Sequence, residues 1–123
     1  KEELPIEKKL VSKKQAQDLI NNWVSAWTNN DFISYKNSYI DDFKGRFLSH
    51  QDWLDNREPR VKYSKNIIIK INNLKIIEQS DNKFKVKFTQ DYSSNAIKSL
   101  GTKTLEFTLI DNVFKISGEI FSK

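Results

Sequence analysis

Residues 83–92 read Lys-Phe-Lys-Val-Lys-Phe-Thr-Gln-Asp-Tyr, and this stretch decides the fold. Apolar or aromatic side chains occupy most of its even-numbered positions, and charged or polar ones occupy the odd-numbered positions. A period of two is typical of a strand that buries one face and exposes the other. We therefore predict a half-buried strand whose three lysines lie on the solvated face. The residues predicted to face inward are Phe84, Val86, Phe88, Gln90 and Tyr92.

Further strands are predicted on both sides of this one. Residues 67–77 are rich in isoleucine, and Asn72-Asn73 within them indicates a bulge or break. Residues 79–82 are expected to form a turn, and residues 93–98 a loop. The strand after that loop should present one apolar face, formed by Leu105, Phe107 and Leu109.

Asp111-Asn112 is typical of a two-residue hairpin turn between the last two strands. If Ile110 pairs with Val113, the register follows by counting outward, and the apolar residues of both strands fall on one face. The predicted pairs are Leu109 with Phe114, Phe107 with Ile116, Leu105 with Gly118, and Lys103 with Ile120.

The first part of the chain has a helical period instead. Residues 1–11 are mostly charged, contain Pro5 and are predicted to form a linker or N-terminal arm. Ser12 and Gln15 fit a capping box, which satisfies backbone N–H groups at a helix start. We expect a helix from there to Asn29-Asn30. Its apolar stripe comprises Ala16, Leu19, Ile20, Trp23, Val24 and Trp27.

Two shorter helices are predicted next. Asp31 can cap one and Ser49 the other, with an irregular turn around Gly45 between them. Pro59 is predicted to break or kink the third helix near Arg57, because its ring and its missing N–H disrupt the preceding turn. The inward residues are expected to be Phe32, Tyr35 and Tyr39 on the second helix, and Trp53, Leu54 and Arg57 on the third.

This order of elements predicts an α+β fold, in which three N-terminal helices pack on a four-stranded antiparallel meander. The 123 residues fit a single domain, predicted over residues 12–123. With 37% hydrophobic and 12% aromatic residues, the chain has the material for one core. Because the chain does not begin with Met, we expect it to be a domain of a larger protein or a processed chain.

The composition excludes several functions. There is no Cys, which rules out a disulfide framework, a thiol nucleophile and a thiolate zinc site. Three glycines and one His do not form a phosphate-binding loop or a multi-histidine metal site, so we expect neither metal nor cofactor. The net charge of +5 is spread along the chain, so no nucleic-acid partner is predicted. No apolar run approaches the roughly 20 residues of a membrane span, and we expect no membrane insertion.

Aromatic residues with polar tips gather in the helical half of the chain. Core packing explains them by itself, since aromatic side chains dominate core burial. Alternatively, their N–H and O–H groups line a pocket and orient a ligand. Both interpretations stay open for Trp23, Trp27, Tyr35, Tyr39 and Trp53.

Polar residues at inward positions of the sheet are the sharper signal. Gln90 is either a satisfied structural amide or a pocket-lining donor and acceptor. Lys103 at an inward position requires a carboxylate or a wet cavity. Glu119 is the attractive partner, but ideal alternation points it outward, opposite Thr104. A bulge at Gly118 would turn it inward, so the Lys103–Glu119 pair is an open alternative.

Candidates for charge recognition and catalysis are few. Arg57 could clamp an anionic group with two hydrogen bonds, or form a salt bridge between helices. His50 is expected to be a solvated residue at a helix start, although a lone His can act as a general base. No two carboxylates can be assigned to one cavity. We therefore predict no catalytic residue.

Several short motifs follow one another along the chain: Trp23 with Trp27, Tyr35 with Tyr39, Trp53 with Arg57, residues 88–93 (FTQDYS), Lys103-Thr104-Leu105, and Phe114-Lys115-Ile116 with Glu119. Their order resembles the nuclear transport factor 2-like superfamily. More narrowly, residues 12–121 are similar to the C-terminal domain of cell-shape L,D-carboxypeptidase and L,D-transpeptidase-type proteins of curved and helical Gram-negative bacteria. One departure is Phe114, where the pattern has Trp.

The resemblance implies a cone-shaped accessory domain without catalytic activity, whose protein carries a Cys nucleophile in a separate upstream domain. It implies a periplasmic location, a peptidoglycan fragment or peptide-like ligand, and a possible homodimer. The aromatic wall would be completed by polar contacts from Arg57, Gln90, Tyr92, Lys103 and, if it faces inward, Glu119. The alternatives are a small-molecule enzyme of the same fold, isomerase-like or dehydratase-like, and a periplasmic dimerisation or scaffold domain as in type IV secretion.

Overall fold

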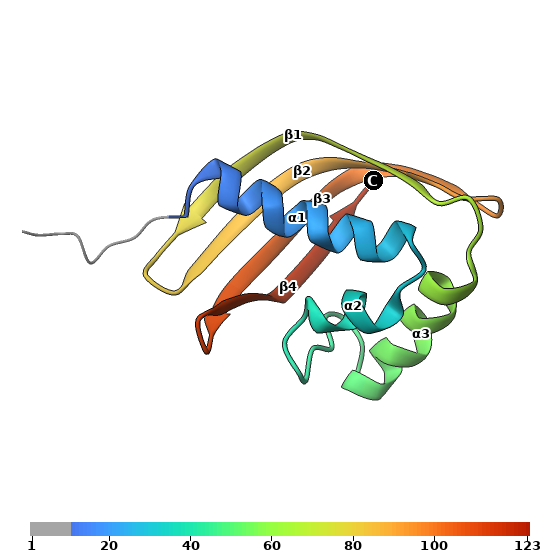
Figure 1. Ribbon diagram of the computed structural model, residues 1–123, viewed down its shortest axis with the longest axis horizontal. Helices are drawn as coiled ribbons and strands as arrows, with labels where there is room; N and C mark the ends of the chain where they lie inside the picture. Colours follow the sequence, from blue (N-terminus) through green and yellow to red (C-terminus); the bar gives the residue numbers. More distant parts are fainter. Residues whose placement is uncertain (1–10) are drawn as a thin grey trace, which may run out of the picture.

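Three helices precede four strands in the computed structural model, which describes residues 11–123 (Figure 1). The strands form one curved antiparallel sheet in the order β1-β2-β3-β4. Helix α1 lies across one face of the sheet, and α2 and α3 lie together at one end (Figure 1). The predicted α+β fold is therefore confirmed. The elements are α1 (Lys13–Thr28), α2 (Phe32–Asn37), α3 (His50–Tyr63), β1 (Ile68–Gln79), β2 (Lys83–Ser93), β3 (Lys98–Ile110) and β4 (Val113–Ser122).

Each helix begins at the capping residue that the sequence predicts. The Ser12 side chain accepts a hydrogen bond from the Gln15 N–H, and the Gln15 side chain accepts one from the Ser12 N–H. Asp31 and Ser49 cap α2 and α3 in the same way, each through its side-chain oxygen. These bonds satisfy backbone donors that have no partner within the helix. The local sequence thus sets all three helix starts.

The predicted break at Pro59 is wrong, because α3 continues through it to Tyr63. Pro59 is exposed, so the carbonyl that loses its helical donor can be hydrated by water. Beyond the proline, Val61 is buried and fastens the last turn to the core. The Asn30 amide also donates to the carbonyls of Val61 and Ser64, both at 2.8 Å. Packing and capping together offset the cost of the proline.

The predicted arm over residues 1–11 falls almost entirely outside the described residues, which begin at Val11. Val11 itself is buried. Its N–H donates to Gln79 Oε1 at 2.9 Å, and its carbonyl accepts from Gln79 Nε2 at 3.4 Å. Val11 is therefore attached to the end of β1 and belongs to the core.

Strand β2 follows its predicted alternation, since all five predicted inward residues of the sequence 83–92 are buried. β1 pairs with it through an irregularity between Asn72 and Lys75, at the predicted bulge, where Asn73 has a positive φ of 59°. Ser93 and Lys98 pair with each other, so the loop is shorter than predicted.

The β3–β4 hairpin turns at Asp111-Asn112 as predicted, with φ of 51° and 68°, a conformation that suits a two-residue hairpin. The predicted pairs hold as far as Phe107 with Ile116. Beyond them a bulge shifts the register by one residue. The predicted pairs of Leu105 with Gly118 and of Lys103 with Ile120 are therefore wrong. The observed pairs are Leu105 with Glu119 and Lys103 with Phe121.

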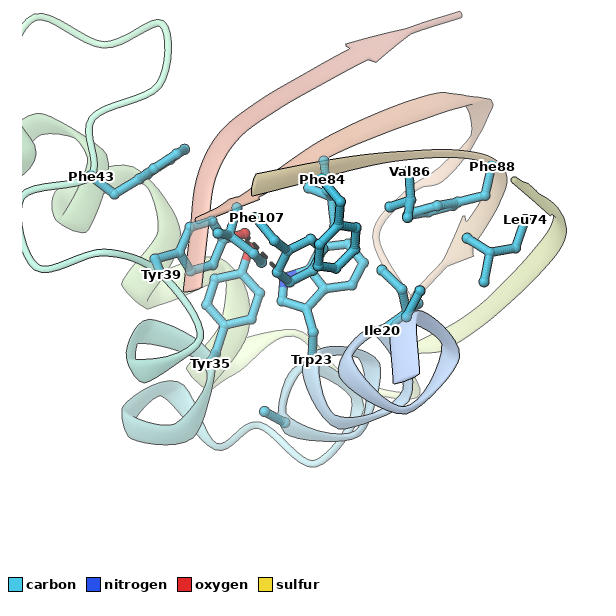
Figure 2. Close-up of a cluster of buried hydrophobic side chains, with 14 of the residues drawn as sticks. Ile20, Trp23, Tyr35, Tyr39, Phe43, Leu74, Phe84, Val86, Phe88 and Phe107 are labelled. Atoms are coloured by element: carbon cyan, nitrogen blue, oxygen red, sulfur yellow. Dashed lines mark hydrogen bonds between the residues drawn. The ribbon is translucent and has the colours of Figure 1, made fainter. Parts of the chain in front are cut away.

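The core lies between α1, α2 and the inner face of the sheet (Figure 2). Its centre is Trp23, which contacts the Phe88 ring edge-on and stacks with Tyr35. Trp23 Nε1–H donates to the Tyr39 hydroxyl at 3.1 Å, so the buried indole donor has a partner (Figure 2). Tyr39 also forms a bridge to Ile116, which fastens the chain after α2 to β4.

We predict that Asn30→Gly lowers the free energy of unfolding by about 1–2 kcal/mol, because two carbonyls at the end of α3 lose their donor. Glycine keeps the positive φ of 59° that position 30 requires, so the loss reports the amide alone. Asn66→Gly is the matched control, since Asn66 also has a positive φ and its amide bond to Asn95 is exposed. Equal urea midpoints for the two variants would contradict the prediction.

Candidate functional site

A cavity of about 690 Å³ lies between α3 and the inner face of β2, β3 and β4. Trp53, Arg57 and Arg60 line it from α3. The sheet contributes both polar and aromatic side chains. Further lining residues come from α1, α2, the segment between α2 and α3, and the loop between β2 and β3. The cavity is large enough for a small ligand and combines aromatic walls with a few polar groups, which is typical of ligand sites.

Most of the residues predicted to bind a ligand line this cavity, and two do not. Trp23 and Tyr39 are fully buried behind the wall, so the core interpretation holds for them. Binding itself stays a prediction. The predicted residues that line the cavity are Trp27, Tyr35, Trp53, Arg57, Gln90, Tyr92, Lys103 and Glu119.

Glu119 faces inward, because the bulge in β4 places it on the same face as Lys103. Lys103 Nζ donates to Glu119 Oε2 at 2.6 Å, and Arg57 Nη2 donates to Glu119 Oε1 at 3.4 Å. The side chains of Glu119 and Lys103 are only 5% and 6% exposed. The alternative of a Lys103–Glu119 pair is therefore the one that the structure adopts, and Arg57 completes an ion triad.

A chain of hydroxyl groups supports the same carboxylate from behind. The Tyr39 hydroxyl donates to Glu119 Oε1 at 3.1 Å. The Tyr35 hydroxyl lies 3.0 Å from that of Tyr39. Since Tyr39 has a single proton and gives it to the carboxylate, Tyr35 is the donor in the second bond. Glu119 thus accepts from a lysine, an arginine and a tyrosine.

Burial and the charges of the triad shift the pKa of the triad residues and of the neighbouring Tyr35. Burial alone would raise the pKa of Glu119, but the charges of Lys103 and Arg57 outweigh it, and the pKa of that carboxyl lies below its usual value. Burial lowers the pKa of Lys103, against the attraction of Glu119. Burial raises the pKa of Tyr35 to about 12. The triad holds two cations for one anion, so an incoming anion is favoured over an incoming cation.

Further cations line the cavity that the sequence pattern did not single out. Arg46 comes from the segment before α3, Arg60 from α3, and Lys123 directly follows β4. Among the described lining residues, Glu119 is the only carboxylate. Arg60 could have been found, because it lies one turn after Arg57 on the same helix. Nothing in the local pattern around Arg46 points to a cavity.

The two remaining polar candidates are Gln90 and His50. Gln90 is 4% exposed, and its Oε1 has no hydrogen-bond partner. His50, predicted to be solvated, is half-buried: its Nδ1–H donates to the Phe43 carbonyl at 2.6 Å and its ring stacks on Trp53. It does not line the cavity. Burial of His50 follows from the segment 43–47 folding back over the start of α3.

In residues 11–123 no group of three or more acidic or histidine side chains is placed to hold a metal ion. Across the same described part of the chain, no helix is long and apolar enough to cross a membrane.

A curved sheet with three helices enclosing a cavity of this kind defines the nuclear transport factor 2-like (NTF2-like) class of domains. Residues 15–120 match the Cds6 C-terminal NTF2-like domain, and the chain belongs to that family. The predicted resemblance to the superfamily is thereby confirmed. No curated protein matches the chain.

Solved structures share the fold over most of the chain. Bd1075 of Bdellovibrio bacteriovorus is 25% identical, with a TM-score of 0.76 over 91% of this chain and 43% of that one. The helical cell shape determining protein Pgp2 (K307A mutant) of Campylobacter jejuni is 18% identical, with a TM-score of 0.76 over 86% of this chain and 39% of that one. The chain therefore spans less than half the length of these two proteins.

The same fold also occurs in proteins of nearly the same length as this chain. A candidate dehydratase of the NTF2-like family from Streptomyces avermitilis is 11% identical, with a TM-score of 0.71 over 86% of this chain and 91% of that one. The class includes both enzymes and non-enzymes, so fold alone does not assign an activity.

We predict that the stability of the wild-type chain falls more steeply with decreasing pH than the stability of the Glu119→Gln variant. The pKa of Glu119 is depressed in the folded state, so its contribution to stability is complete above the unfolded value of about 4.3 and is lost as the pH falls below it. At pH 7 the variant should lose about 3 kcal/mol, because Lys103 stays buried without its carboxylate.

The measurement is urea unfolding from pH 7 to pH 3. Glu78→Gln is the control, since Glu78 is an exposed carboxylate and its substitution should leave the pH profile parallel to that of the wild type. A Glu119→Gln profile that also runs parallel to the wild type would show that the triad does not stabilise the fold.

Proposed function

We propose that this chain is a non-catalytic pocket domain that binds an acidic, peptide-like ligand derived from peptidoglycan, as an accessory to a cell-wall L,D-peptidase in the periplasm. The observation that carries the proposal is the charge of the cavity. Among the residues that the structure describes, the lining has five basic side chains and one acidic side chain, that of Glu119. The basic residues are Arg46, Arg57, Arg60, Lys103 and Lys123.

Peptide fragments of the cell wall carry free carboxylates, and arginine binds carboxylates with two parallel hydrogen bonds. Arg57 is suited to this because its Nη2 bond to Glu119 is long, at 3.4 Å, and its Nε has no partner. The aromatic walls from Trp27, Trp53 and Tyr92 would cover the apolar parts of the ligand. Charge and apolar surface together favour an amphipathic acid over a bare anion.

The structural similarity to Pgp2, a helical cell shape determining protein, supports a role at the cell wall. That protein is more than twice the length covered by the shared domain, which supports an accessory role beside another domain. Homodimerisation is a separate proposal, for which Leu100, exposed on the outer face of the sheet opposite Asp91, is a candidate.

Acid–base catalysis within the cavity has weaker support. Glu119 is the one carboxylate at hand among the described lining residues, and two cations and a tyrosine stabilise its ionised form. Such a carboxylate is a poor proton acceptor, since its pKa is lowered. His50 lies outside the cavity lining and is bonded to the backbone.

We predict that a tripeptide-bearing muropeptide shifts the backbone amide signals of Gln90, Lys103 and Glu119 in a nuclear magnetic resonance titration. Arg57→Gln should weaken binding about tenfold or more, since a charge-assisted hydrogen bond is lost. Arg60→Gln, which changes an exposed residue of the cavity rim, should weaken it in the same direction. Added salt should weaken wild-type binding.

Lys87→Gln is the control, because it removes the same charge from an exposed position on the outer face of the sheet. Its affinity should stay within about twofold of the wild type, since a solvated charge at that distance is screened. Unperturbed cavity amides at millimolar muropeptide, or equal losses in the Lys87 and Arg60 variants, would refute the proposal.

A further inference from the structure

Three buried polar atoms beside the cavity have no hydrogen-bond partner. They are Trp53 Nε1, Arg57 Nε and Gln90 Oε1, and within residues 11–123 they are the buried side-chain nitrogen and oxygen atoms left without one. All three residues line the cavity. Native proteins pair nearly all such atoms, because an unpaired buried polar group is costly. Their gathering at one cavity points to a ligand that completes them.

The three atoms differ in chemistry according to the wall that carries them. Trp53 and Arg57 lie one turn apart on α3, and both unpartnered atoms are N–H donors. Gln90 comes from β2 on the sheet side, and its unpartnered atom is an acceptor. The cavity therefore has donors on its helical wall and an acceptor on its sheet wall.

A trans peptide group matches this arrangement, because its C=O and N–H point in opposite directions. We infer that the cavity recognises a peptide group of its ligand, whose carbonyl accepts from the α3 donors and whose N–H donates to Gln90. The inference rests on the proposed function, and it assigns to Gln90 a role in specificity that the charged residues do not supply.

Other groups satisfy only part of the set. A carboxylate accepts from both donors on α3 but offers no proton to Gln90. An ester offers a carbonyl but likewise has no N–H.

The test compares two probes that differ in one atom group: N-acetylalanine, which has a single amide group, and O-acetyllactate, in which an ester oxygen replaces the N–H of that group. Both keep the terminal carboxylate, and each is prepared with either configuration at its chiral carbon. In amide-shift titrations of the 123-residue chain, we expect N-acetylalanine to bind about tenfold more tightly than O-acetyllactate in at least one configuration, as the loss of one buried hydrogen bond predicts.

Gln90→Leu should remove this preference, so that the two probes bind with equal affinity. Gln51→Leu is the matched control: Gln51 is exposed on α3, and the preference should persist. The comparison of probes on the wild-type chain needs no variant, so the inference can be tested even if Gln90→Leu does not fold.

The outcomes separate this inference from the proposed function. If both probes shift the cavity amides with equal affinity on the wild-type chain, acidic ligands bind but the cavity does not recognise the peptide group. The inference is then overturned, while the proposed function stands. If the preference persists in folded Gln90→Leu, another residue reads the N–H and the inference is also overturned. If neither probe nor the muropeptide binds, the proposed function fails as well.

Discussion

The arrangement of the cavity depends on the burial of one carboxylate, that of Glu119. A carboxylate taken out of water is costly unless opposite charges and hydrogen bonds replace its hydration. Here the replacements come from three different parts of the chain: Lys103 on β3, Arg57 on α3 and Tyr39 after α2. Each of these groups is held in place by the need to satisfy the same carboxylate. Glu119 therefore connects the sheet to the helices across a space that apolar packing leaves open.

The aromatic residues of the helical half are divided between two roles. Trp23 and Tyr39 lie in the core and are hydrogen-bonded to each other, while Tyr35 and Trp53 stand in front of them and border the cavity. Tyr35 stacks on both tryptophans, Trp23 and Trp53, with ring centroids 6.4 Å away in each case. The cavity wall is thus the front layer of a two-layer aromatic stack. A wall backed in this way is rigid, which lowers the entropic cost of ordering it on binding.

How far the sequence predicts this structure depends on whether the deciding interaction is local. The caps at Ser12, Asp31 and Ser49 and the alternation of β2 were predictable, because each involves neighbours along the chain. The continuation of α3 through Pro59 was not, since it depends on Asn30, which lies far away in sequence. In the site, inward polar residues such as Gln90 and Lys103 were found because they interrupt an apolar face. Arg46 was not, because it lies on an irregular segment without any period.

The bulge in β4 affects how the cavity can change during evolution. Side-chain direction in a strand alternates with each residue, so one additional residue between Ile116 and Glu119 decides whether the carboxylate enters the cavity or faces solvent. Loss of a single codon there would leave the composition of β4 almost unchanged while removing the anion from the triad. In this domain, insertions and deletions in the last strand act on the chemistry of the cavity as directly as substitutions do. An alignment of relatives must therefore place its gaps in β4 so that inward-facing residues are compared with inward-facing residues.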